Sequence, residues 1–130
     1  MAFYYEKLDH VQLAAPKNQE QTARDFYVTL LGFQEIVKPE ALQKNGGIWV
    51  QSGDVHLHIG VEEDFTPAKK SHPAIYVRHL AELKKHLRAH SISIVEDERL
   101  PGFHRFYIFE PFGNRLEFLE KSQPIFLPKR

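Results

Sequence analysis

The sequence contains no cysteine among its 130 residues, which excludes both disulfides and metal sites with thiolate ligands. Any metal would need imidazole and carboxylate ligands, and these suit zinc, nickel, manganese or iron. The sequence also lacks an excess of one charge, because 17 basic residues balance 17 acidic ones. This balance argues against nucleic acid or an anionic membrane as a partner. Apolar runs are short as well, and none approaches the roughly 20 residues of a membrane span.

The N-terminal segment MAFYYEKLDH has no long apolar stretch either. Charged side chains at Glu6, Lys7 and Asp9 interrupt the region where a signal peptide needs one, so we expect a cytoplasmic protein. With 42% hydrophobic residues, a chain of this length can form one domain with a packed core.

The two halves of the chain repeat one pattern of hydrophobic residues. Alternation and helical spacing predict the order strand, helix, strand, strand, strand in each half. The expected ranges are 8–15, 19–31, 33–38, 46–52 and 55–61 in the first half, and 71–78, 80–89, 91–95, 103–110 and 114–120 in the second. We therefore predict an α+β fold of two tandem βαβββ modules in a single domain. Module one covers 7–61, a polar linker 62–70, module two 71–120, and an extended tail 121–130.

Residue types that bind metals recur at matching places in the two modules. His10 lies near the start of the first strand of module one, and His72 takes the same place 62 residues later. His58 in the last strand of module one matches Glu117, which follows 59 residues later. Because residues two apart share a strand face, these side chains lie on polar faces, and the opposite faces are apolar and suit packing under the helices. A buried polar face has to be paired or bound to metal, so we expect a metal site.

These features resemble the vicinal oxygen chelate superfamily, which holds glyoxalase I, fosfomycin-resistance enzymes, bleomycin-resistance proteins and extradiol dioxygenases. The resemblance covers residues 8–120 and rests on the paired modules and on the segments DFYVTLLGF (25–33) and RFYIFEPFGNRLEF (105–118). The second segment is similar to the family ending Asp-Pro-x-Gly-Asn-x-x-Glu, with Glu110 in place of the aspartate and Glu117 at the metal-binding glutamate. The resemblance implies curved mixed sheets around a cavity, with His10, His72 and Glu117 as ligands of one divalent ion (Zn, Ni, Mn or Fe).

The residue at position 58, His58, could have either of two roles in such a site. In glyoxalase I the matching residue is a glutamate that binds the metal and moves the substrate proton, whereas other members manage with two histidines and one glutamate. A neutral imidazole at His58 could serve as fourth ligand or as base. His56 shares its strand face, but the match of Leu57 with Leu116 favours His58. The expected catalytic residues are therefore His58 and Glu117.

The family resemblance implies chemistry on a small substrate that chelates the metal through two adjacent oxygens. Candidates for holding the substrate are Gln12, Arg105, Tyr107 and Arg115. The leading interpretation is a metal-dependent lyase or isomerase of glyoxalase type. The alternatives are a non-haem iron dioxygenase, a fosfomycin-type thiol transferase, and a metal-free binding protein like the bleomycin-resistance proteins. Two-module members commonly share sites between subunits, so we expect a homodimer with His10 and His58 from one chain and His72 and Glu117 from its partner.

Overall fold

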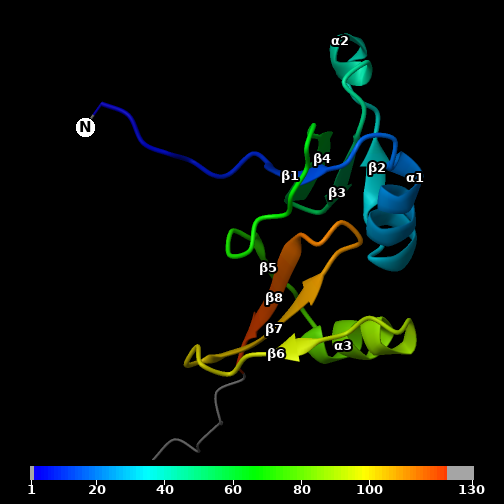
Figure 1. Ribbon diagram of the computed structural model, residues 1–130. Coiled ribbons are helices and arrows are strands. Elements are labelled where there is room, and N and C mark those ends of the chain that lie inside the picture. The colour runs from blue at the N-terminus through cyan, green and yellow to red at the C-terminus, as the bar shows by residue number, and fades with distance from the viewer. Residues whose placement is uncertain (1, 123–130) are drawn as a thin grey trace, which may run out of the picture. The chain divides into compact units, whose positions relative to one another are not determined.

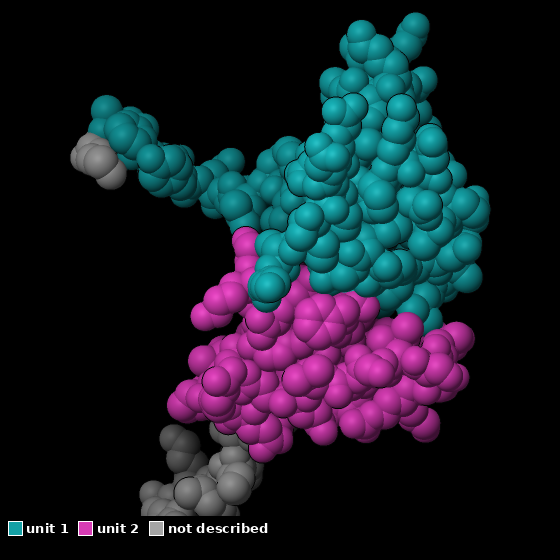
Figure 2. Space-filling model, viewed as in Figure 1, with its two compact units in different colours: residues 1–69, 110–114 teal, residues 70–109, 115–130 magenta. Residues whose placement is uncertain are grey.

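The computed structural model describes residues 2–122, and the chain divides into two compact units (Figures 1 and 2). Unit 1 comprises Met1–Lys69 and Glu110–Asn114, and unit 2 comprises Lys70–Phe109 and Arg115–Arg130. Most of the expected tail, residues 123–130, lies outside the described residues. No helix within residues 2–122 is long and apolar enough to cross a membrane.

Each unit is built on one open sheet of four strands. The sheet of unit 1 has the order β1-β4-β3-β2, with β1 Val11–Ala15, β4 Val55–Val61, β3 Ile48–Ser52 and β2 Gln34–Ile36. The sheet of unit 2 has the matching order β5-β8-β7-β6, with β5 Ala74–Tyr76, β8 Arg115–Lys121, β7 Phe103–Phe109 and β6 Val95–Glu96. In each sheet the first pair of strands is parallel and the others are antiparallel. The predicted α+β fold of two βαβββ modules is confirmed.

One face of each sheet is apolar and forms the core with the unit's helix, as the alternation predicts. In unit 1 the core includes Leu13, Leu57 and Ile59 of the sheet with Phe26 and Tyr27 of the helix. In unit 2 the long helix α3 (Leu80–Ala89) buries Leu80 and Leu87, and the sheet buries Phe106, Ile108, Leu116 and Phe118. The polar face of each sheet is therefore left for other contacts.

The helix of unit 1 differs from the regular helix expected at 19–31. It begins as α1 (Glu20–Ala23) and continues as a π-helix, η1 (Arg24–Leu30). The wider turn is seen where the Leu31 N–H donates to the Phe26 carbonyl, five residues back, over 2.9 Å. The helix ends at Gly32, whose φ of +84° suits a residue without a Cβ.

Several predicted boundaries were too generous. The strand expected at 8–15 begins at Val11, and the strand expected at 71–78 begins at Ala74, so His10 and His72 both precede their strands. Pro73 explains the second case in part, because proline has no N–H to donate to a neighbouring strand. The strand expected at 91–95 is reduced to Val95–Glu96. A short helix, α2 (Glu40–Gln43), was not expected at all.

Candidate functional site

In unit 2 the predicted ligands His72 and Glu117 are in direct contact. The Nε2 atom of His72 lies 2.9 Å from Oε1 of Glu117, whose side chain is almost fully buried in β8. The other ring nitrogen, Nδ1, lies 2.6 Å from the Lys70 carbonyl oxygen. A carbonyl only accepts hydrogen bonds, so Nδ1 carries the proton, and in the neutral ring Nε2 presents a lone pair to the carboxylate. Two such acceptors need a proton or a cation between them.

This pair fits a metal ion by geometry and by chemistry. Two neighbouring ligand atoms at about 2.0–2.2 Å from one ion, at right angles around it, lie about 3 Å apart. The 2.9 Å between Nε2 of His72 and Oε1 of Glu117 meets this condition. A backbone carbonyl on the second nitrogen is the usual way in which a ligating histidine is oriented.

Basic and aromatic side chains surround the buried carboxylate. Arg105 donates from Nη1 to the second oxygen of Glu117 over 3.4 Å, and from Nη2 to Asp97 over 3.3 Å. The hydroxyl of Tyr107 also donates to Asp97, over 3.3 Å. The Arg115 guanidinium stacks 4.0 Å from the centre of the Tyr107 ring. The three candidates of module two therefore gather around Glu117.

Two features of this cluster bear on ligand binding. Among the described residues, the Nε atoms of Arg105 and Arg115 are buried and make no hydrogen bond. Asp97 was missed by the sequence analysis because it follows a two-residue strand and belongs to no recognisable motif. Hydrogen bonds from Arg99, and the charge of Arg105, hold the pKa of Asp97 well below its usual range. Asp97 is therefore a fixed anion that holds Arg105 in place beside Glu117.

In unit 1 the other predicted pair, His10 and His58, is stacked. Their ring centres lie 3.9 Å apart with an interplanar angle of 13°, and Trp49 stacks on His58 at 3.9 Å and 6°. His58 is thus enclosed between two rings. Burial, followed by the nearby charge of His10, lowers the pKa of His58 below its usual 6.5. His58 is therefore neutral at pH 7.

The surroundings of His10 and His58 suit the two side chains to different roles. Nδ1 of His10 lies 2.9 Å from the carboxylate of Asp9, so in the neutral ring Nε2 is free to bind a metal. Because the two rings are stacked nearly parallel, their ring nitrogens do not point toward one common position. Gln12 is paired with His58 in the register of β1 and β4. Among the described residues His56 makes no ring contact, and its strand neighbour is Gln51.

The register of the two sheets places the pairs equivalently. Gln12, two residues after His10, lies opposite His58 in the parallel pair β1–β4. Ala74, two residues after His72, lies opposite Glu117 in the parallel pair β5–β8. Within residues 2–122, no three His, Asp or Glu side chains form a group that could hold a metal. Each unit thus supplies two of the four predicted groups.

Comparisons with known proteins agree with this architecture. The model of the Glyoxalase/Bleomycin resistance protein/Dioxygenase superfamily matches residues 7–118. A glyoxalase family protein from Bacillus anthracis is 47% identical, with a TM-score of 0.91 over 94% of this chain and 100% of that one. Lactoylglutathione lyase from Agrobacterium tumefaciens is 21% identical, with a TM-score of 0.63 over 85% of this chain and 91% of that one.

The antibiotic binding protein TnmS3 from a Streptomyces species is similar in fold too. It is 18% identical, with a TM-score of 0.68 over 91% of this chain and 100% of that one. A search of curated proteins gave no match.

Proposed function

Since the chain belongs to the Glyoxalase/Bleomycin resistance protein/Dioxygenase superfamily, we propose that it is a metal-dependent lyase or isomerase of glyoxalase type. Its substrate is a small molecule that offers two adjacent oxygens to a divalent ion, which is Zn, Ni, Mn or Fe. The observation that carries this proposal is the pair of acceptor atoms, Nε2 of His72 and Oε1 of Glu117, held 2.9 Å apart.

In this proposal His10, His72 and Glu117 hold the ion. Both histidines have their Nδ1 atoms bonded to an acceptor, Asp9 or the Lys70 carbonyl, and both direct Nε2 away from it. When bound, the ion supplies Lewis acidity, which stabilises the negative charge that develops on a substrate oxygen.

His58 is assigned as the base that moves the substrate proton. Its parallel stacking on His10 disfavours joint ligation of one ion by the two rings. Its lowered pKa keeps the imidazole unprotonated at neutral pH, as a base requires. Trp49 and His10 fix the plane of the ring, so its nitrogens can take a proton only from a limited range of directions.

The remaining candidates bind and orient the substrate. Arg105 and Arg115 present cationic groups beside Glu117, and each retains an unpaired Nε–H among the described residues. Tyr107 lies against Arg115, and Gln12 extends from β1 beside His58. Arg105 and Tyr107 are held by Asp97 and so contribute without large rearrangement.

We propose further that the complete site forms in a homodimer. His10 and His58 would come from one chain, and His72 and Glu117 from its partner. A two-fold symmetric dimer then contains two equal sites, and both of them are complete. A cytoplasmic location, which accords with the absence of cysteine, is part of the same proposal.

A second candidate function is metal-free binding of a flat molecule. The stack of Trp49, His58 and His10 favours it, because aromatic faces of this kind also take up planar ligands. The fold does not decide between the two, since a lyase and an antibiotic binding protein are both similar to it.

Metal titration tests the proposal. The full chain, freed of metal with a chelator, is titrated by calorimetry with Zn²⁺, Ni²⁺, Mn²⁺ and Fe²⁺. We expect about one ion per chain and an affinity that falls roughly 100-fold or more in Glu117→Ala. The control His104→Ala removes an exposed histidine from β7 and should bind as the wild type does. If none of the four ions binds saturably, the enzyme proposal fails and the binding function takes its place.

A further inference from the structure

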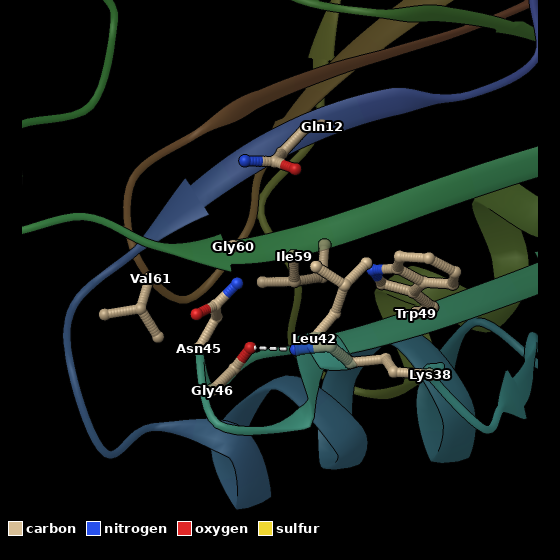
Figure 3. A pocket seen from close by; sticks show the side chains of 9 residues that line it. All are labelled: Gln12, Lys38, Leu42, Asn45, Gly46, Trp49, Ile59, Gly60 and Val61. Atoms are coloured by element: carbon tan, nitrogen blue, oxygen red, sulfur yellow. Dashed lines mark hydrogen bonds between the residues drawn. The ribbon is translucent and has the colours of Figure 1, made fainter. Parts of the chain in front are cut away.

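A pocket of about 420 Å³ opens in unit 1 (Figure 3). One of its lining residues, Trp49, stacks on His58. Its walls come from β1, β3, the end of β4 and the segment that contains α2. The lining residues are Gln12, Lys38, Leu42, Asn45, Gly46, Trp49, Ile59, Gly60 and Val61. A volume of this size is typical of small-molecule sites. Of these residues, only Gln12 was predicted from the sequence to contact a substrate.

The segment around α2 is fixed in place by glycines and by two polar contacts. Gly47 has a φ of +80°, and a Cβ there would lie 2.0 Å from the Ile59 carbonyl oxygen, so only glycine allows this close approach. The Gly47 N–H donates to the Glu20 carboxylate over 2.8 Å. Lys38 donates from its ammonium group to the Gly46 carbonyl. The pocket is therefore present before any ligand arrives.

Lys38 supplies a cation, and within residues 2–122 no carboxylate forms an ion pair with it. Among the described residues, its hydrogen-bond partner is the neutral Gly46 carbonyl, which leaves two N–H donors of the ammonium group. The charge of Lys38 acts on Glu20, but that carboxylate is already engaged by Gly47, whose N–H is the largest cause of its lowered pKa.

Three further polar groups at the pocket have no partner within residues 2–122. They are the side-chain amides of Gln12 and Asn45 and the indole N–H of Trp49. In Figure 3, Gln12 lies on one side of β4, and Asn45 and Lys38 lie on the other, near Gly46. Gly60 makes room for Gln12, because a Cβ at Gly60 would lie 2.6 Å from its amide nitrogen. Leu42, Ile59 and Val61 complete the lining with apolar surface.

We propose that this pocket binds the carboxylate end of a small organic acid, with the ammonium of Lys38 and the amides of Gln12 and Asn45 as donors. The apolar body of the acid lies against Leu42 and Trp49. The inference deepens the proposed function and rests on it for the role of the bound acid as a substrate. Because Trp49 also stacks on His58, an acid held here extends toward the proposed base. Binding at this remote end would hold the reacting atoms in position.

The chain's single tryptophan is Trp49, so its indole N–H signal in NMR spectra reports on this pocket alone. The metal-free full chain is titrated with phenylacetate, 3-phenylpropionate and the uncharged phenylacetamide. We expect saturable shifts of the indole signal with both carboxylates. The affinity for the uncharged amide should be lower than that for phenylacetate by roughly tenfold or more. A similar loss is expected for phenylacetate in Lys38→Met. The matched control Lys44→Met removes an equal charge from an exposed lysine outside the pocket and should bind as the wild type does.

Two additional variants distinguish ligand binding in the pocket from other effects of a substitution. Asn45→Ala preserves the contact between Lys38 and Gly46 and should weaken phenylacetate binding, which separates ligand binding from loop stability. His104→Ala should bind phenylacetate as the wild type does, because His104 is exposed on β7 and does not line the pocket. The proposal is overturned by the absence of any indole shift, by equal binding of acid and amide, by full affinity in Lys38→Met, or by loss of binding in His104→Ala. A failure of metal binding would overturn the proposed function and leave this result standing.

Discussion

The hydroxyl of Tyr27 donates a hydrogen bond of 2.8 Å to the carboxylate of Glu110, which lies 83 residues further along the chain. Glu110 is only 3% exposed, and its other oxygen accepts the N–H groups of Phe112 and Asn114 over 2.8 and 2.9 Å. Asn114 in turn donates to the Ala14 carbonyl over 2.7 Å. The turn that precedes the strand of Glu117 is thereby attached to the helix and to β1 of unit 1.

Tyr27→Phe should lower the free energy of unfolding by about 1–3 kcal/mol, because one oxygen of a buried carboxylate loses its donor. Urea denaturation measures the change. Tyr5→Phe removes the same hydroxyl from a side chain that is 90% exposed and should leave the stability unchanged. Equal effects of the two substitutions would show that the bond to Glu110 contributes nothing.

Burial raises the pKa of Glu110 above its usual 4.5 and outweighs the hydrogen bonds that lower it. The folded state therefore holds the Glu110 proton to a higher pH than the unfolded state does. Between the unfolded-state and the folded-state pKa of Glu110, the free energy of unfolding therefore falls as the pH rises, starting near pH 4.5. Glu110→Gln does not ionise, so its stability relative to the wild type should increase between pH 4 and pH 7. A relative stability that is constant, or that changes in the opposite direction, would contradict the raised pKa.

His58→Gln should change metal affinity by less than roughly tenfold, because a base outside the ligand set is not needed to hold the ion. His72→Gln removes a ligand and should lower the affinity by roughly 100-fold or more. Calorimetric titration of the two variants with the same ion gives the comparison. Equal losses would reassign His58 as a ligand. If His58 is the base, turnover should be retained at pH 7 and fall only below pH 6.5, since its pKa is lowered.

The repeat and the strand alternation were sufficient to predict the fold and the matching positions of the four candidate metal ligands in the two modules, but His10 and His72 precede their strands instead of lying within them. The offsets between the two modules can be read directly from the sequence. In the structure they correspond to equivalent strand registers, in which Gln12 lies opposite His58 and Ala74 lies opposite Glu117. The assignment of these residues to one metal site stays a prediction.

The stack on His58 and the pocket beside it could not be predicted in the same way. In the sequence, Trp49 is one apolar residue of an expected strand. Its contact with His58 depends on which residues of β3 and β4 lie opposite each other. The helix α2 spans only four residues, too few for a periodic pattern. The loop that carries Lys38 and Asn45 is held by long-range contacts with Glu20 and Ile59, which no local pattern reveals.

In the proposed dimer, His10 and His58 of one chain complete an active site with His72 and Glu117 of its partner, and His10, His72 and Glu117 hold the metal ion. The most direct test is the metal content of a purified heterodimer of one His10→Ala chain and one Glu117→Ala chain, each with a different affinity tag. Neither variant can form an intact site by itself, but their heterodimer has one site in which all four residues are present. Sites shared between subunits predict about one ion per heterodimer, half the content of the wild-type dimer, and close to none in either homodimer. Metal content near zero in the heterodimer, with wild-type dimers fully loaded, would contradict shared sites and place each site within a single chain.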